Sequence, residues 1–143
     1  MSAKKWPPPG FPIVEGRHAL TADWSIHLPT QFARRIEDGD LVLWRPGLTL
    51  WLAAWGNDHA QSRDDRLAQV KRGASPRRFA ECESEADGIT RYSYRLRDEN
   101  EGGSVESLYA FVFNDRGQLQ IAIYFDDPGD GDEARRLVDG ISG

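Results

Sequence analysis

The sequence predicts an α+β domain: an antiparallel sheet of about six strands, built from three hairpins and packed by a mid-chain and a C-terminal helix. Hairpin patterns occupy residues 40–55, 78–96 and 104–127, while helical patterns occupy 62–76 and 130–142. A doubly wound parallel sheet alternates strand with helix along the chain, so consecutive hairpins exclude it. The order of elements therefore favours an antiparallel sheet with helices packed on it.

Composition and charge narrow the function classes. A chain of 143 residues suits one domain. The net charge of -5 argues against nucleic acid as a partner, because phosphate binding needs a basic stripe. Cys82 is the only cysteine, which excludes an intramolecular disulfide and a thiolate metal cage. The sequence shows no apolar run of membrane-spanning length and no signal-peptide core, so we expect a cytoplasmic protein with no membrane span, if the source is bacterial.

Residues 1–16 are expected to form a proline-rich arm, and residues 17–143 the domain itself. Three consecutive prolines force an extended, polyproline-like path on the arm. Trp6 and Phe11 flank these prolines, and we expect both aromatic side chains to dock on the domain. The domain then opens with the sequence WSIHLP, a short predicted strand over 24–29 that Pro29 ends, followed by a turn or short helix.

The first hairpin has the sequence GDLVLWRPGLTLWLAAWG, over residues 39–56. Pro46 suits a turn position with φ near −65°, and Gly47 suits a left-handed position. With Trp44 paired to Leu48, one face carries Val42, Trp44, Leu48, Leu50 and Leu52, and the other carries Leu41, Leu43, Trp51 and Trp55. Both faces are thus apolar, although a sheet with helices on one side should leave its other side polar.

Two helices are expected, over 62–72 and 132–141. Ser62 is a suitable N-cap for the first, and acidic residues in its first turn with basic residues in its last turn complement the helix dipole. In the second, Asp130 and Glu133 suit a capping box. Its apolar stripe is predicted to comprise Ala134, Leu137, Val138 and Ile141.

The second and third hairpins turn at Asp87-Gly88 and at residues 114–117. In the third, the predicted pairing sets Phe113 opposite Leu119, Phe111 opposite Ile121 and Tyr109 opposite Ile123. That face is predicted to be core. Its reverse carries Leu108, Ala110, Val112, Gln120, Ala122 and Tyr124.

With this order of elements, the chain resembles the PsbP-like fold over residues 24–142. The resemblance lies in the opening WSIHLP, the strand pair GDLVLWRPGLTLWLAAW, the helix RLAQVKRGAS, the strand IAIYFDD and the closing LVDGIS. The family includes a photosystem II extrinsic subunit, a Ran-release factor and small bacterial proteins, among them adaptor chaperones for secreted effectors. The resemblance implies a binding scaffold in the cytoplasm and carries no catalytic signature.

The sequence predicts no catalytic residue, metal site or cofactor. The three histidines lie far apart and lack metal-pair spacing. The acidic run 126–133 does not fit the EF-hand pattern, because Pro128 and Leu137 fall at ligand positions. Glu81, Glu83 and Glu85 share a strand face with Tyr92 and Tyr94, where exposed carboxylates discourage edge pairing.

The second apolar face of the first hairpin is the predicted binding site: Leu41, Leu43, Trp51 and Trp55. The sequence leaves three alternatives for what lies against this face: the arm or a helix of the same chain, a protein partner or second copy, and a small apolar ligand in a groove beside the sheet. The leading hypothesis is a non-enzymatic protein-binding or adaptor/chaperone-like module. The alternative is a small hydrolase or other enzyme that uses the glutamates or a histidine in such a groove.

Overall fold

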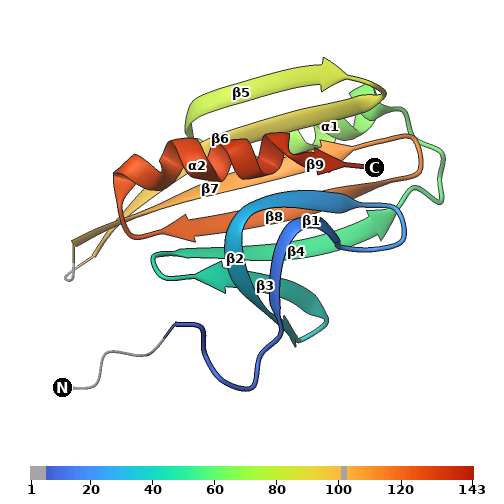
Figure 1. Ribbon diagram of the computed structural model, residues 1–143. Helices are drawn as coiled ribbons and strands as arrows, with labels where there is room; N and C mark the ends of the chain where they lie inside the picture. Colours follow the sequence, from blue (N-terminus) through green and yellow to red (C-terminus); the bar gives the residue numbers. More distant parts are fainter. Residues whose placement is uncertain (1–5, 101–102) are drawn as a thin grey trace.

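The computed structural model describes residues 6–100 and 103–143, which form an α+β fold with a nine-stranded antiparallel sheet and two helices (Figure 1). The predicted class is confirmed, but six strands was too few. The elements are β1 (Ile13–Ala19), β2 (Ser25–Glu37), β3 (Asp40–Arg45), β4 (Leu48–Gly56), α1 (Arg63–Gly73), β5 (Phe79–Ala86), β6 (Ile89–Asn100), β7 (Gly103–Phe113), β8 (Gly117–Phe125), the 3₁₀ turn η1 (Pro128–Asp130), α2 (Gly131–Asp139) and β9 (Ile141–Ser142).

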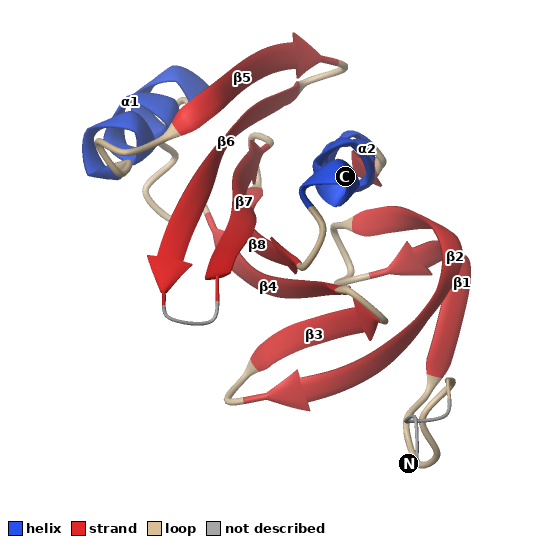
Figure 2. Ribbon diagram, turned by 90° about the vertical axis from the view of Figure 1, so that its left-hand side faces the viewer, coloured by secondary structure: helices blue, strands red, loops and turns tan. Residues whose placement is uncertain are grey.

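The strands follow the order β1-β2-β3-β4-β8-β7-β6-β5, and β9 pairs with β2. Every pairing is antiparallel. The two helices lie on opposite sides of the sheet, with α1 outside β5 and β6 and α2 on the inner side, between β6-β7 and β1-β2 (Figure 2). The strands β4 and β8, at the middle of the order, join the two halves of the sheet.

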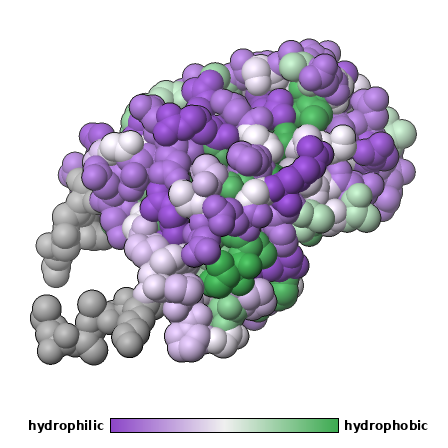
Figure 3. Space-filling view, in the orientation of Figure 1, coloured by the Kyte–Doolittle hydropathy of each residue, from purple (hydrophilic) through white to green (hydrophobic). Residues whose placement is uncertain are grey.

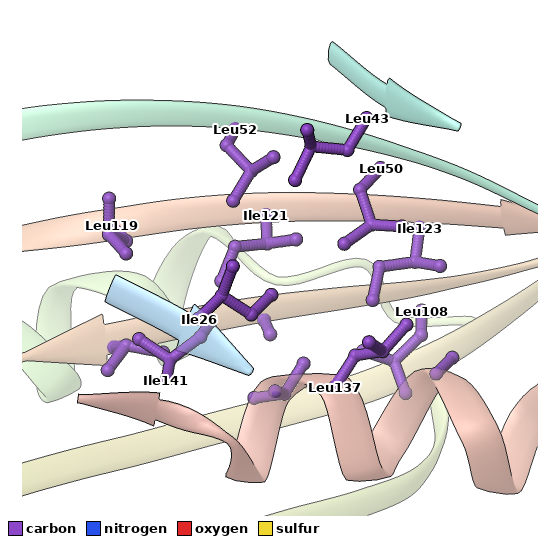
Figure 4. Packing of buried hydrophobic residues seen from close by; sticks show 14 of the residues in the cluster. Ile26, Leu43, Leu50, Leu52, Leu108, Leu119, Ile121, Ile123, Leu137 and Ile141 are labelled. Atoms are coloured by element: carbon purple, nitrogen blue, oxygen red, sulfur yellow. The ribbon is translucent and has the colours of Figure 1, made fainter. Parts of the chain in front are cut away.

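The main core lies between the sheet and α2. Leu137 of α2 packs beside Leu108 of β7, and Ile141 of β9 packs beside Ile26 of β2 (Figure 4). Each fully buried aliphatic side chain of this kind stabilises the fold by roughly 1.5–3 kcal/mol. A second, smaller cluster on the opposite side packs Leu67 of α1 against β6 and β7.

The N-terminal part of the sheet is longer than predicted. Strand β1 begins at Ile13, ahead of the predicted domain boundary at residue 17. Strand β2 runs through Pro29, which was wrongly predicted to end it. The pairing of β1 with β2 passes from Leu28 to Phe32 across an irregularity. Pro29 lies in that interval, where its missing N–H costs the β1–β2 ladder no hydrogen bond.

The register of the first hairpin differs from the prediction by one residue. Arg45 pairs with Leu48, so Pro46 and Gly47 alone make the turn, with Gly47 at φ +81°. Trp44 therefore lies opposite Thr49. A shift of one residue moves side chains to the other face. The α2 side carries Leu41, Leu43, Leu48, Leu50 and Leu52, and the opposite side carries Val42, Trp44, Trp51 and Trp55.

The third hairpin shows the same kind of shift. Phe113 pairs with Gln118, because Asn114 fixes a turn in which its side-chain oxygen accepts from the N–H groups of Arg116 and Gly117. The predicted pairing, which set Phe113, Phe111 and Tyr109 opposite Leu119, Ile121 and Ile123, is therefore wrong. The side that faces the main core comprises Leu108, Ala110, Val112, Leu119, Ile121 and Ile123. Phe113 is buried in the smaller cluster under α1, and Phe111 and Tyr109 pack against that cluster.

The second hairpin and α1 agree with the prediction. Asp87 (φ 55°) and Gly88 (φ 77°) form the turn, and the Ser62 hydroxyl accepts a 3.0 Å hydrogen bond from the N–H of Asp65. The predicted capping box of α2 is wrong, because the Asp130 side chain makes no cap bond and Glu133 pairs with Arg45 instead. The helix ends at Asp139, so Ile141 belongs to β9 rather than to a helical stripe.

Candidate functional site

The structure separates the four residues of the predicted binding patch. Leu41 and Leu43 are buried in the core on the α2 side. Trp51 is half-buried and Trp55 is 49% exposed, and both lie on the opposite side of the sheet. Two residues of the patch are thus structural, and the two tryptophans belong to a different surface.

That surface, here called the aromatic face, is the side of β3, β4, β8 and β7 that faces away from α2. Its cross-strand rows follow from the register: Trp51 lies beside Ala122 and then Tyr109, and Ala53 lies beside Gln120 and then Phe111. Tyr124 is 39% exposed at one end and Trp55 is exposed at the other. The face comprises Trp44, Trp51, Trp55, Tyr109, Phe111 and Tyr124.

Strand β8 lies in the middle of the aromatic face. Its side chains there are Gln118, Gln120, Ala122 and Tyr124, and the first three are shorter than the aromatic rings of the neighbouring strands. Trp51 and Trp55 of β4 lie on one side of β8, and Tyr109 and Phe111 of β7 lie on the other. Two residues four apart on a strand lie about 13 Å from each other, which spaces the two tryptophans along β4.

Helix α1 covers only the neighbouring part of this side of the sheet. Leu67 packs against Tyr92, Tyr94 and Phe113 of β6 and β7. The apolar stripe of α1 is narrow, with Val70 and Ala74 partly buried beside Leu67. In the part of the chain that the structure describes, neither α1 nor α2 lies over the aromatic side of β4 and β8 (Figure 2).

Stacked rings connect the cluster under α1 with the rest of the aromatic face. Tyr94 stacks on Tyr109 with ring centroids 5.8 Å apart, and the Tyr109 and Tyr124 hydroxyls lie 3.5 Å apart. The hydrogen bond with Tyr109, together with burial and the charge of Asp98, raises the pKa of Tyr124 to about 12. The Tyr124 hydroxyl therefore stays protonated at neutral pH and can donate a hydrogen bond.

The arm contacts the aromatic face at Trp44. Phe11 lies edge-on against Trp44, with centroids 5.0 Å apart and an interplanar angle of 80°. The guanidinium of Arg35 lies 4.6 Å from the Trp44 ring centre and 5.8 Å from that of Trp51. Trp6, the other predicted docking residue, is half-buried beside a depression lined by Glu15, Thr30, Gln31, Arg45, Pro46 and Glu133.

A groove of about 310 Å³ opens at the end of the sheet beside Trp55. Leu41 and Trp55 line it together with Ile36, the most exposed large hydrophobic residue described, and with Arg34 and Asp40. This volume lies at the lower limit for small-molecule sites. The sequence analysis named a small apolar ligand as one possible occupant of a groove beside the sheet, and this groove is where the structure could hold one.

The predicted face of Glu81, Glu83 and Glu85 exists, and its carboxylates are engaged with neighbouring side chains. Glu81 accepts a 2.6 Å hydrogen bond from the Tyr92 hydroxyl, which lowers the pKa of Glu81 together with a bond from Arg78. Glu83 pairs with Lys71 and Glu85 with Arg63. The ion pairs of Glu83 and Glu85 attach β5 to α1.

The view onto the α2 side shows a mostly hydrophilic surface, with one compact hydrophobic patch low down beside β1 and β2 (Figure 3). The aromatic face lies on the other side of the molecule. Among residues 6–100 and 103–143, no helix has both the length and the apolar character that crossing a bilayer requires.

Comparisons with known proteins give one kind of result, a likeness of fold. No family model matches the chain, and no curated protein matches it. Among solved structures, it is similar to a protein of Bacteroides thetaiotaomicron VPI-5482, with a TM-score of 0.68 and 11% sequence identity. The likeness covers 91% of this chain but 49% of that protein, so the chain spans about half of its length. At this identity the likeness shows the fold alone.

Proposed function

We propose that the protein is a non-enzymatic binding module that holds a protein partner on its aromatic face. The observation that supports this is the set of six aromatic side chains on one side of the sheet. Two of them, Trp55 and Tyr124, are substantially exposed at opposite ends, and the four between them are partly buried. Apolar surface that gathers on one face of a protein marks interaction sites. Tryptophan and tyrosine are also enriched among the residues that dominate binding energy at protein interfaces.

The proposal includes the PsbP-like scaffold, an adaptor or chaperone-like role and a cytoplasmic location, which the sequence resemblance implies. In the self-associating form of this function, a second copy of the chain is the partner that binds the aromatic face. The groove beside Trp55 favours a small apolar ligand as a second candidate, because Ile36 and Trp55 form an exposed apolar rim there.

No specific observation favours the hydrolase alternative. It needs a histidine with two carboxylates within hydrogen-bond reach, but His18 is hydrogen-bonded to Arg34 at 2.7 Å. Burial, followed by the charge of Arg34, lowers the pKa of this histidine. Within the described residues, no group of three His, Cys, Asp or Glu side chains could hold a metal ion.

Site-specific photo-crosslinking in the producing cells tests the binding function. A photoreactive phenylalanine at position 124 samples the aromatic face, and the same residue at position 68 samples the exposed side of α1 as a matched control. We expect a discrete protein adduct from position 124 that position 68 does not give. Equal adducts from both positions, or none from position 124, would contradict the proposal.

A further inference from the structure

We propose that the groove beside Trp55 binds a small aliphatic monocarboxylate, with Arg34 as the partner of the ligand's carboxylate. This inference rests on the second candidate function, the small apolar ligand, and names the chemical class of that ligand. It does not depend on which protein the aromatic face holds.

The groove lies on the core side of the sheet. Phe32, Arg34 and Ile36 alternate along β2 with residues of the other side, and Phe32 is fully buried in the main core. The register sets Ile36 beside Leu41, and Leu41 beside Leu52. Leu52 points to the same side of the sheet as the other labelled core residues (Figure 4). Arg34 and Ile36 therefore face the same side as the leucines that line the groove.

The floor of the groove is the outer end of the main core. Leu41, Leu52 and Leu119 line the groove and belong to that core, and Leu20, from the loop between β1 and β2, packs against it. Ile36 lies at the rim, with 62% of its surface exposed. An alkyl chain in the groove would extend the core and remove this apolar side chain from water.

Arg34 supplies a positive charge to the groove. Its side chain is half-buried, and its Nη1 donates a 2.7 Å hydrogen bond to Nε2 of His18 on β1. Among residues 6–100 and 103–143, no carboxylate lies within ion-pair distance of Arg34. A guanidinium carries five N–H donors in a fixed fork, so one bond to His18 leaves donors for a carboxylate.

His18 orients Arg34 without neutralising it. A guanidinium only donates, so Nε2 of His18 accepts, and the imidazole is in its neutral form with the proton on Nδ1. Burial and then the charge of Arg34 lower the pKa of His18, which agrees with a neutral ring. The positive charge of Arg34 is thus left for an anion, whose hydrogen bonds to it would be charge-assisted.

Asp40, the other charged residue of the groove, limits the ligand to one carboxylate. Asp40 pairs with Glu37, three residues and about 10 Å along β2 from Arg34. A second carboxylate on the ligand would meet either the apolar floor or the charge of Asp40, and both are unfavourable. An aliphatic amine is a poor alternative occupant, because Arg34 would repel it.

The test is an NMR titration of the full chain, observed at the methyl signals of Ile36, Leu41 and Leu52. We expect hexanoate to shift these signals and to bind at least about tenfold more tightly than hexan-1-ol, because only hexanoate makes charge-assisted bonds. Hexanedioate should bind at least about tenfold more weakly than hexanoate. From butanoate through hexanoate to octanoate, affinity should rise by up to about fourfold for each added methylene.

Variants assign the binding to Arg34. Arg34→Met removes the charge, so it should weaken hexanoate by at least about tenfold and change the affinity for hexan-1-ol by less than about twofold. Arg17→Met is the matched control, since Arg17 is an exposed arginine of the neighbouring strand β1 and lies outside the groove. It should bind hexanoate as the parent does. Melting curves verify that both variants fold.

A second pair of variants tests the charge of the ligand without altering Arg34. Ile36 is largely exposed, so Ile36→Gln and Ile36→Glu should both fold, and they differ mainly by one negative charge. Ile36→Glu should weaken hexanoate at least about threefold more than Ile36→Gln does, because the added carboxylate repels the anion. Both variants should weaken hexan-1-ol to the same extent.

Equal binding of hexanoate and hexan-1-ol would reject the anion and retain a small apolar ligand. The inference would also be overturned if hexanedioate bound as tightly as hexanoate, if Arg17→Met lost as much affinity as Arg34→Met, or if Ile36→Glu and Ile36→Gln weakened hexanoate equally. No shift of the groove methyl signals with any probe would reject both the inference and the second candidate function. The photo-crosslinking experiment at position 124 decides the protein-binding function separately.

Discussion

Arg66 of α1 donates a 2.9 Å hydrogen bond to the backbone carbonyl of Gly117 and a second bond to the carbonyl of Asn114, at the turn between β7 and β8. Its side chain is buried, and its guanidinium lies 5.4 Å from the ring centre of Phe113. One residue thus attaches the helix to the hairpin formed by β7 and β8.

Replacing this arginine should therefore destabilise the fold. Arg66→Met removes the donors and leaves two carbonyls near the core without them, so we expect a loss of about 2–4 kcal/mol in the free energy of unfolding. Urea denaturation measures it. Arg72→Met, at an exposed position of the same helix, should change stability by less than about 0.5 kcal/mol. Equal effects of the two substitutions would show that the Arg66 bonds contribute little.

Glu106 gives a prediction about acid stability. Burial would raise the pKa of Glu106, but hydrogen bonds from Arg97 and Arg95 outweigh it, so the folded-state pKa lies below the ordinary value. A carboxyl with a depressed folded pKa stabilises the protein above its unfolded pKa, about 4.3, and that stability is lost as pH falls through the folded pKa. We expect unfolding free energy to fall below about pH 5, and less steeply in Glu106→Gln.

At neutral pH, Glu106→Gln should itself cost on the order of 2–3 kcal/mol, because it removes the partner of two arginines. The cost is below that of a fully buried triad, since about half of the Arg97 side chain remains in solvent. Denaturation curves at a series of pH values measure both effects. An unchanged pH slope in the variant would mean that other carboxylates carry the acid sensitivity.

Gly47 tests the turn of the first hairpin. Its φ of +81° is a conformation that residues with a Cβ adopt at a cost, and a Cβ there would meet no atom within 4 Å. Gly47→Val should therefore cost about 1–2 kcal/mol through backbone strain alone. Gly73→Ala, at the end of α1, is the control: a Cβ there also meets open space and φ is not positive, so the melting temperature should stay the same or rise slightly.

The arm gives the fourth prediction, on Trp44. Deleting residues 1–12 removes Phe11 and should expose the Trp44 ring, so acrylamide quenching of tryptophan fluorescence and binding of an apolar dye should both rise. Phe11→Ala should reproduce most of the change and cost about 0.5–1.5 kcal/mol for the lost aromatic pair. If Phe11→Ala leaves quenching at the parental level, the contact does not shield Trp44 in solution.

The sequence was sufficient for the fold class, the turn residues and the cap of α1, because these depend on local chemistry. It was insufficient for register. In the first and third hairpins both strand faces are apolar, so the alternation of apolar and polar residues does not decide which side chains face the core. The number of residues in the turn fixes the register and decides it instead. Taking Pro46-Gly47 alone as the turn, and Asn114 as its own Asx turn, would have assigned both faces correctly.

The open face could be suspected from the sequence, but its composition could not. Because both faces of the first hairpin are apolar, the sequence indicated that something must lie against the face turned away from the core. Trp51 and Trp55 do lie on that face. Tyr109 and Phe111 join them only through the pairing of β7 with β8, which brings together residues far apart in the chain. Arg66 and Glu106 carried no local signal, because charged residues on a helix or strand are usually exposed.

Strand β8 also divides its residues between two tasks. Leu119, Ile121, Ile123 and Phe125 are buried in the core, while Gln118, Gln120, Ala122 and Tyr124 alternate with them on the other side. Selection can therefore change the second set without altering the first, and a new specificity need not cost stability. Libraries randomised at the alternate positions 118, 120 and 122 should yield mostly folded proteins, which makes this strand a convenient place to redesign what the molecule recognises.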